Sequence, residues 1–363
     1  LVKQESPLVG TGMEEIVARQ SEWGIFAEGD GEVLYTDAEK ISVKYKKEGV
    51  KDYNLVSFYR SNENTCFTQK PVVKSGDKFK KGDILADGPT IVNGEFSIGT
   101  NLRAALMFYE GYNYEDSVII SDRIVRDDLL TSIHIREHTV DIRDTELGPE
   151  IITADIPHVN DRILQKLDSQ GIVRSGVHVK SGDILVGVVA PRGEKELTAE
   201  ERLLRAIFGE SASDVRDNSL RIPHGEEGIV VRSLILSTDK GDKLAPGVLH
   251  QVKVWVANTK KIGFGDKIAG RHGDKNTVAA IRPIEDMPFT EDGEPVDIVL
   301  TPTFLKRMNM GQAEEVHFGK FAEELNQKLA FPIFEGENME WLLNEMKKQG
   351  KDMSQRVDLY DGR

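Results

Sequence analysis

A length of 363 residues, a hydrophobic content of 39% and a formal net charge of −14 describe a folded, acidic chain with room for about two or three compact units. No apolar run approaches the roughly 18 residues that a membrane helix requires, and the start has no signal or transit peptide pattern. The negative charge argues against a protein that simply coats nucleic acid, because neutralising phosphates requires local Lys and Arg.

The two ends and the cysteine content give further expectations. The chain begins with Leu1 rather than Met and stops at the turn-like tetrapeptide Tyr360–Arg363, so we expect both ends to be cut rather than natural. A single cysteine, Cys66, excludes an intramolecular disulfide and a cysteine-cluster metal site. This favours a reducing, cytoplasmic compartment. We expect the thiol to be a buried, small apolar group rather than a nucleophile.

Residues 1–270 are predicted to consist mostly of strands and turns. The segments Lys40–Tyr45 and Gly228–Val231 carry alternating or β-branched patterns between Gly or Asp residues. A recurring Gly-Asp pair is typical of hairpin corners, because Gly adopts a positive φ and Asp tolerates a tight turn. The pair occurs at Gly76-Asp77, Gly82-Asp83, Gly182-Asp183, Gly241-Asp242 and Gly265-Asp266.

Two of these turns have closely similar surroundings. Val73–Asp77, followed by Gly82–Leu85, resembles Val179–Leu185, which indicates hairpin corners in small barrels. The same pattern occurs in biotinyl and lipoyl carrier domains, whose hairpin tip presents a modifiable Lys beside Met. No Met-Lys pair stands at these turns. The carrier interpretation is therefore weak.

A helix is predicted near the middle of the chain, between polar, loop-like residues. Thr198 and Glu201 form a capping box at its start, and Gly209 ends it. Large apolar side chains fall on one stripe of this helix. Taken alone, the stripe favours packing against the helix's own domain. Its members are Leu203, Leu204, Ile207 and Phe208.

A basic segment lies within the acidic chain between His250 and Arg282. This contrast predicts a localised anion site, and a solvated charged face is the alternative. Against only Asp266 and Asp274, the segment contains Lys253, Lys260, Lys261, Lys267, Arg271, Lys275 and Arg282.

The most informative part of that segment is Gly265–Lys275, which reads Gly-Asp-Lys-Ile-Ala-Gly-Arg-His-Gly-Asp-Lys. Its glycines permit close approach of the backbone to a bulky anion. Lys267 and Lys275 are compact cations that suit phosphate oxygens and the charge that develops in phosphoryl transfer. The segment does not match the Gly-x-x-x-x-Gly-Lys-Thr loop of nucleotide-binding proteins. On the residues alone, a polyphosphate site and an ordinary surface turn are equal alternatives.

The chain after Gly311 is predicted to be helical, first from Gln312 to Leu329. A second helix has Asn338 as its N-cap and Gly350 as its stop. Its apolar face is predicted to contain Trp341, Leu342, Leu343 and Met346.

Residues 265–275 resemble the Gly-Asp-Lys-hydrophobic-Ala-Gly-Arg-His-Gly-Asn-Lys-Gly signature of multisubunit RNA polymerase beta subunits. Gly111–Ser117, Leu197–Gly209 and Ile284–Pro288 resemble three further signatures of that family, in the family's order. Matching segments extend from Pro7–Glu14 to Tyr360–Arg363, so the resemblance covers essentially the whole chain. It points to a central to C-terminal part of a bacterial DNA-directed RNA polymerase beta subunit.

The resemblance implies an α+β fold that is mainly β. A double-psi-type β-barrel is expected from residues 1–128 and 257–310. An inserted sandwich-barrel hybrid flap domain is expected over 129–256, with its tip helix at 199–208, and a helical segment over 311–363. The resemblance reverses the preference for the apolar stripe, because the family's flap tip grips the sigma factor. Leu203, Leu204, Ile207 and Phe208 would then contact sigma.

The implied reaction is template-directed nucleotidyl transfer by a cytoplasmic, nucleoid-associated enzyme. Partners would be the beta-prime and alpha subunits, sigma factor, template DNA, nascent RNA and nucleoside triphosphates. Lys267 and Lys275 would hold phosphates of the initiating or incoming nucleotide near the RNA 3′ end. Arg307 matches the family arginine that contacts the incoming triphosphate, although alone it would be a surface charge at a helix start.

Glu115 and Asp116 are implied to lie near a second, nucleotide-borne Mg²⁺ and to act through water or by orienting neighbours. Without the resemblance they would belong to a surface turn. Arg271 and His272 are expected in the same neighbourhood. The catalytic Mg²⁺ is implied to be held by an aspartate triad of beta-prime, and no Asp-x-Asp-x-Asp string occurs here. The chain alone is therefore expected to be inactive, with a non-catalytic assembly or interaction role as the alternative.

The sequence departs from the family pattern at two places. Asp274-Lys275-Asn276 stands where Asn-Lys-Gly is usual. The added carboxylate is expected to weaken the local positive potential, and the lost Gly to narrow the allowed backbone. Before Arg307, the stretch Thr301–Lys306 is one residue shorter than the usual Asn-Pro-Leu-Gly-Val-Pro-Ser.

Overall fold

The chain's structure is a computed structural model that describes residues 1–157, 159–191, 215–332, 339–350 and 356–362. The predicted helix at 199–208 and the predicted cap Asn338 lie outside these residues. The chain divides into two compact units. The first unit comprises Leu1–Tyr59, Phe67–Ser132 and Lys260–Arg363, and the second comprises Arg60–Cys66 and Ile133–Thr259.

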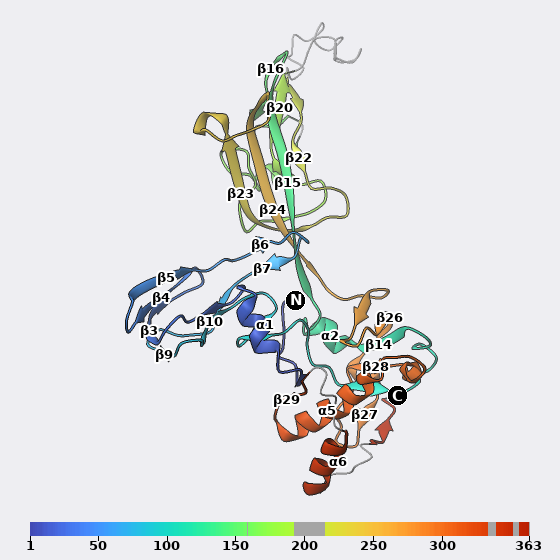
Figure 1. The fold of residues 1–363 in the computed structure, drawn as a ribbon. Coiled ribbons are helices and arrows are strands. Elements are labelled where there is room, and N and C mark those ends of the chain that lie inside the picture. The colour runs from blue at the N-terminus through green and yellow to red at the C-terminus, as the bar shows by residue number, and fades with distance from the viewer. Residues whose placement is uncertain (158, 192–214, 333–338, 351–355, 363) are drawn as a thin grey trace. The chain divides into compact units, whose positions relative to one another are not determined.

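The described part of the chain is mostly β with few helices, which confirms the predicted α+β class (Figure 1). Two strand predictions are confirmed at their predicted starts. Strand β4 spans Lys40–Tyr45, and β23 spans Gly228–Ser237. None of the described helices is long and apolar enough to cross a membrane.

Two sheets form the N-terminal part of the first unit, with strand orders β5-β4-β3-β9 and β2-β10-β8. In β4, Ile41, Val43 and Tyr45 point to the same face, because alternate residues of a strand do so, and all three are buried. They pack with Leu85 in one hydrophobic cluster. The strands are β2 (Ile25–Phe26), β3 (Gly31–Thr36), β5 (Gly49–Asn54), β8 (Lys70–Pro71), β9 (Lys78–Phe79) and β10 (Ile84–Asp87).

The Gly-Asp turns all adopt the predicted conformation. Their φ values are 90° at Gly76, 90° at Gly82, 87° at Gly182, 87° at Gly241 and 84° at Gly265. The aspartate does more than tolerate the turn. Its carboxylate closes each turn by accepting a hydrogen bond from an earlier backbone N–H, at distances of 2.7–2.9 Å. The donors are the amides of Lys74, Lys80, Lys180, Ser237 and Gly263.

A second sheet system of the first unit joins segments that are far apart in the sequence. Its strand order is β13-β28-β14-β26-β25. The central strand β14 is buried, with Val118 and Ile120 in one hydrophobic cluster and Ile119 in another. A strand covered on both faces is a continuous apolar run rather than an alternating one. The bounds are β13 (Ala104–Leu106), β14 (Ser117–Ser121), β25 (Lys267–Ala269), β26 (Lys275–Arg282) and β28 (Ile298–Leu300).

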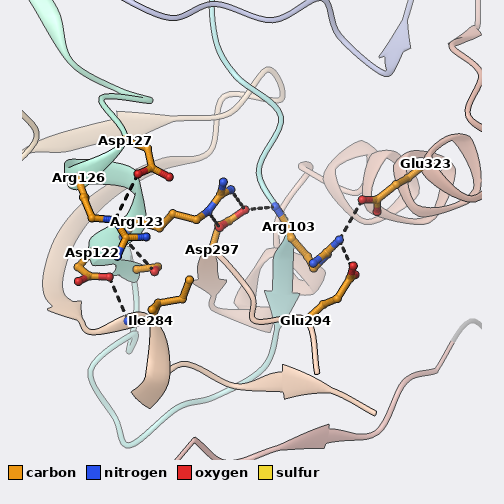
Figure 2. Close-up of polar contacts among 10 residues, drawn as sticks. Arg103, Asp122, Arg123, Arg126, Asp127, Ile284, Glu294, Asp297 and Glu323 are labelled. Carbon is orange, nitrogen blue, oxygen red and sulfur yellow. Dashed lines mark hydrogen bonds and ion pairs between the residues drawn. The ribbon is translucent and has the colours of Figure 1, made fainter. Parts of the chain in front are cut away.

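A partly buried ion pair joins this sheet to a short helix, α2 (Asp122–Arg126) (Figure 2). Asp297, which precedes β28, is 5% exposed. Its carboxylate accepts Arg123 Nε at 2.7 Å and Nη2 at 2.8 Å, and it also accepts the backbone N–H of Arg103 at 2.9 Å. The Arg103 side chain reaches away, to Glu294 and Glu323.

Three short helices that were not predicted lie within residues 1–270, the region predicted to be mostly strands and turns. They are α1 (Glu14–Gln20), α2, and α3 (Asp161–Leu164). Helices α2 and α3 are five and four residues long, too short for a 3.6-residue period to show. Side chains at Ser121 and Asn160 cap them by accepting the amides of Arg123 and Arg162.

The C-terminal helices are confirmed with corrected ends. Helix α5 spans Gly311–Leu325 and stops at Asn326, which is left-handed with φ 52°. The predicted extension to Leu329 is wrong, because Leu329–Ala330 forms β29 and pairs in parallel with β1 (Val9–Gly10). Helix α6 spans Met339–Lys348, and Gly350 follows it with φ 69°.

The apolar face of α6 is confirmed in part. Leu342 and Met346 are buried against Phe318 and Phe321 of α5. Trp341 is 42% exposed and contacts Phe331 edge to face at 6.0 Å. The smaller remaining elements of the first unit are β11 (Ile91–Val92), β12 (Glu95–Phe96), β27 (Phe289–Thr290), β30 (Leu359–Tyr360) and the 3₁₀ turns Ile284–Asp286 and Pro302–Lys306.

The second unit is built on a sheet of order β16-β15-β24-β23-β18, whose three long strands run side by side in Figure 1. Val252 and Val254 of β24 are buried in its core with Ile142 of β15. Cys66 is half-buried rather than buried. The elements of the second unit are β15 (Ser132–Thr145), β16 (Gly148–Pro149), β17 (Ile151–Ile152), β18 (His178–Val179), β19 (Ile184–Val186), β20 (Val188–Pro191), β21 (Val215–Asp217), β22 (Leu220–Arg221), β23, β24 (Val248–Lys260) and the 3₁₀ turn Thr238–Lys240. Two further short strands, β6 (Tyr59–Arg60) and β7 (Cys66–Phe67), pair with each other.

Candidate functional site: a cationic hairpin beside an acidic loop

Strands β25 and β26 form an antiparallel hairpin that presents Lys267 and Lys275 together, and we call it the lysine hairpin. Lys267 lies opposite Thr277, and Lys275 lies opposite Ala269. Directly opposed residues share a face, as do residues two apart in one strand. The two lysines therefore lie on one face as diagonal neighbours, about 7–8 Å apart. Both are exposed.

The other cations of the basic segment are mostly engaged in ion pairs. Lys253 pairs with Glu137 at 3.4 Å, Lys261 with Asp128 at 3.1 Å, and Arg282 with Glu110 at 3.2 Å. Arg271 pairs with Glu315. Among the described residues, the side chains of Lys267, Lys275 and Lys260 take part in no hydrogen bond or ion pair. Ordinary ion pairing accounts for most other cations of the segment, and Lys260 lies outside the hairpin at the end of β24, so the predicted anion site is narrowed to Lys267 and Lys275.

The loop between β13 and β14, residues 107–116, lies beside this hairpin, and we call it the acidic loop. Asp116 ends the loop, and its carbonyl accepts the N–H of Thr277 at 2.7 Å. Glu115 is exposed and left-handed, with φ 58°, which is uncommon for a residue with a side chain. Asn113 is fully buried; it accepts the Tyr109 N–H at 3.0 Å and donates to the Met107 carbonyl at 2.6 Å. Asn113 therefore fixes the conformation of the loop. The sequence analysis did not identify this residue, although its amide side chain stands between Tyr112 and Tyr114.

Arg307 lies close to the lysine hairpin and the acidic loop and comes from a third segment of the chain. Its guanidinium forms an ion pair with the carboxylate of Asp116. Both side chains also line a small pocket of about 40 Å³ that Lys275 borders. Lys267 instead lines a wider cavity of about 2300 Å³, which shares Asp274, Asn276 and Gln312 with the small pocket. The structure therefore brings Lys275, Arg307 and Asp116 together, with Lys267 on the same hairpin face.

Arg271 and His272 lie at the hairpin tip, and neither lines the small pocket. Both reach Glu315 of α5, with His272 Nε2 2.6 Å from Glu315 Oε2. The hydrogen bond to Glu315 raises the pKa of His272 above its ordinary value, against the opposing effect of burial. Burial alone would raise the pKa of Glu315, but the His272 hydrogen bond and the Arg271 charge lower it overall. These two predicted site residues therefore hold the tip in place.

The first departure from the family pattern, Asp274 and Asn276, lies where the tip loop passes into β26, and the second lies elsewhere, in the stretch that forms the 3₁₀ turn Pro302–Lys306. Asp274 Oδ2 accepts Gln312 Nε2 at 3.1 Å, while its Oδ1 is buried with no hydrogen-bond partner among the described residues. A Cβ at Gly270 would lie 2.4 Å from that Oδ1, so a larger residue there would have to displace the Asp274 carboxylate. Asn276 is buried, and its amide lies 3.5 Å from the Asp274 carbonyl. Both substituted side chains are therefore internal contacts of the loop.

The carboxylates here do not form a metal site by themselves. In the described ranges, no group of three His, Cys, Asp or Glu side chains is placed to hold a metal ion. Glu115 and Asp116 are only two, and Asp116 is already paired with Arg307. Mg²⁺ favours several oxygen ligands in octahedral geometry. The described residues alone do not fit it.

Comparison with known proteins shows the family to which the chain belongs. The model of the family "RNA polymerase Rpb2, domain 6" matches residues 26–363. The chain is 51% identical over 365 residues to the DNA-directed RNA polymerase subunit beta of Acetivibrio thermocellus, covering 100% of this chain and 29% of that protein. Identity is 51% to the subunit of Caldicellulosiruptor bescii, covering 100% and 30%, and 48% to that of Streptococcus suis, covering 100% and 31%.

The chain spans about 30% of the length of these curated relatives, and the similarity extends over all of it. The residues that the family model matches include the lysine hairpin, the acidic loop and Arg307. The chain therefore belongs to the RNA polymerase Rpb2 domain 6 family, and its relatives are bacterial RNA polymerase beta subunits.

Proposed function

We propose that this chain works within an RNA polymerase beta subunit and supplies cationic contacts to nucleotide phosphates at an active centre that other chains complete. The observation that supports this most is the pair Lys267 and Lys275, exposed on one hairpin face without partners among the described residues. Arg307 lies beside Lys275 in the same pocket. The proposed partners are beta-prime and alpha subunits, template DNA, nascent RNA and nucleoside triphosphates.

The chemistry suits these side chains. In nucleotidyl transfer the RNA 3′ oxygen attacks the α-phosphate, and negative charge builds on the departing pyrophosphate. Lysines act there as compact charges, and an arginine fork can grip two phosphate oxygens. The Arg307–Asp116 pair has side chains 48% and 55% exposed. Such an exposed pair contributes at most about 1 kcal/mol. Arg307 is therefore available to an incoming phosphate at little cost.

The proposal requires other chains for catalysis. The resemblance assigns the catalytic Mg²⁺ to the beta-prime subunit, and the described residues here offer no three-ligand site. We expect the purified chain to make no RNA from template, nucleoside triphosphates and Mg²⁺. An enzyme assembled with beta-prime and alpha subunits, whose beta subunit carries this chain, should make RNA. Template-dependent incorporation by the purified chain alone would contradict the proposal.

The proposal also assigns a domain of the beta subunit to each of the two units. Strands from before and after the second unit interleave in the sheet β13-β28-β14-β26-β25, which supports a barrel of double-psi type built around an insert. The insert, Ile133–Thr259, would be the flap. Its tip at 199–208 would dock sigma factor. That tip lies outside the described residues, so its support is the sequence pattern.

Replacing Leu204 and Phe208 by Ser tests the sigma contact. Removing two large apolar side chains should cost about 3–6 kcal/mol of burial at that interface. The melting temperature of the chain should barely change, because these side chains would not belong to its core. Packing on the helix's own domain predicts the reverse, a fall of several degrees with unchanged sigma affinity. Measuring both quantities on one double variant decides between them.

A further inference from the structure

Glu315 holds the tip of the lysine hairpin to the start of α5. Its two carboxylate oxygens take different partners: one accepts Arg271, and the other lies 2.6 Å from His272 Nε2. Arg271 also donates to the carbonyl of Val9. The Glu315 side chain is 28% exposed, so these contacts are partly shielded from water. A hydrogen bond to a charged group contributes more than a neutral one under such shielding.

Neighbours of Glu315 hold the same loop. Asn309 Nδ2 donates to the His272 carbonyl at 2.5 Å, and Gln312 Nε2 donates to Asp274 at 3.1 Å. At Gly311 an added Cβ would lie 2.7 Å from His272 Nδ1. The imidazole therefore lies directly against the first turn of the helix. The loop is fixed at several points along a single segment, residues 309–315.

This segment also continues from Arg307. The chain passes from Arg307 through Asn309 to the first turn of α5, while Lys275 follows directly after the loop that the turn holds. The contacts described above join the loop to the helix, and this joint sets the spacing of Lys275 and Arg307 at their shared pocket. Neither Glu315 nor its two partners, Arg271 and His272, line that pocket.

We propose that Glu315 is a positioning residue, which fixes the lysine hairpin relative to Arg307 without touching the nucleotide. The inference rests on the function proposed above. The same carboxylate also forms an ion pair with Arg271, which offsets the charge of that arginine. Loss of Glu315 would loosen the joint and leave Arg271 and His272 without their shared anion.

The test is a double-mutant cycle in an assembled RNA polymerase whose beta subunit carries this chain. Glu315→Ala should slow nucleotide addition about tenfold, as loss of an orienting residue commonly does. Glu315→Gln, which keeps hydrogen-bond acceptance but not the charge, should be intermediate. In the Lys275→Ala enzyme, Glu315→Ala should slow addition by less than about twofold more, because residues that act through one another are not additive.

The control is Glu323→Ala, which removes an exposed carboxylate and its Arg103 ion pair from the same helix. It should leave the rate unchanged. A wild-type rate for Glu315→Ala, or a full effect in the Lys275→Ala background, would overturn the positioning role. If Glu315→Ala does not assemble, Glu315→Gln is judged by the same cycle. A wild-type rate for Lys275→Ala itself would instead contradict the proposed function.

Discussion

Replacing Lys267 or Lys275 by Ala is expected to slow nucleotide addition at least about tenfold in an assembled enzyme whose beta subunit carries this chain. A tenfold loss corresponds to about 1.4 kcal/mol of transition-state stabilisation. The reason is that each ammonium group is exposed and unpaired among the described residues, so its charge is not already neutralised inside the chain. Binding of the template should barely change, because the contacts proposed are to the nucleotide.

Lys260→Ala is the matched control for this experiment. Lys260 belongs to the same basic segment and also has no ion-pair partner among the described residues, but it lies at the end of β24, outside the lysine hairpin. Its loss removes the same charge and should leave the elongation rate near the wild type. Wild-type rates for both hairpin variants would contradict the phosphate contact and favour a purely assembling role.

Replacing Asp297 by Ala is expected to lower the free energy of unfolding of the first unit by about 3 kcal/mol. The carboxylate lies between two cationic residues, as Figure 2 shows, and three hydrogen bonds end on it. Without it, Arg123 loses both of its side-chain hydrogen bonds there and the Arg103 N–H loses its acceptor. This value is the lower end of the destabilisation that removal of one partner of a buried ion pair causes, because the Arg123 side chain is 33% exposed.

Hydrogen exchange of the amides in β14 and β28 measures this loss in the unit concerned. Asp297→Asn should fall between the wild type and Asp297→Ala, since an amide oxygen can still accept one donor. Glu294→Ala is the control: its pair with Arg103 is exposed, with Glu294 at 59%, so less than about 1 kcal/mol should be lost. Equal losses for Asp297→Ala and Glu294→Ala would show that burial does not strengthen the pair.

Local features of the fold were predictable from sequence because local chemistry determines them. Each Gly-Asp turn depends on one left-handed residue, and the sequence places Gly there. The strand Lys40–Tyr45 shows its alternation within six residues. The closing hydrogen bond from each aspartate was not predicted, although its spacing of three residues from the donor at Lys74, Lys80 and Lys180 was a readable signal.

Element ends were less predictable, because distant partners decide them. Helix α5 ends after Leu325 at the left-handed Asn326, a local stop that the prediction passed over, because the predicted helix ran to Leu329. Pairing with Val9–Gly10, more than 300 residues earlier, draws Leu329 into a strand instead. Trp341 is similarly exposed because its place depends on Phe331, not on the periodicity of its own helix.

The cationic residues of the candidate site could be predicted from the sequence, but the residues that position them could not. The spacing of Lys267 and Lys275 places both on one face once the hairpin forms. Their isolation from carboxylates could not be deduced, since the partners of neighbouring cations come from remote segments. Glu315 was missed for the same reason: it lies 43 residues beyond His272, in a helix whose sequence indicates only an amphipathic surface.

A phosphate-directed label tests the contact between the lysine hairpin and the nucleotide most directly. A nucleoside triphosphate that carries an aldehyde on its terminal phosphate forms an imine with a nearby lysine amine, and borohydride reduction makes the bond permanent. Peptide mapping of the assembled enzyme should then find the label on Lys267 or Lys275 and lose it in the corresponding Ala variant. Labelling confined to other lysines, with both hairpin residues unmodified, would contradict the proposal that this face binds nucleotide phosphates.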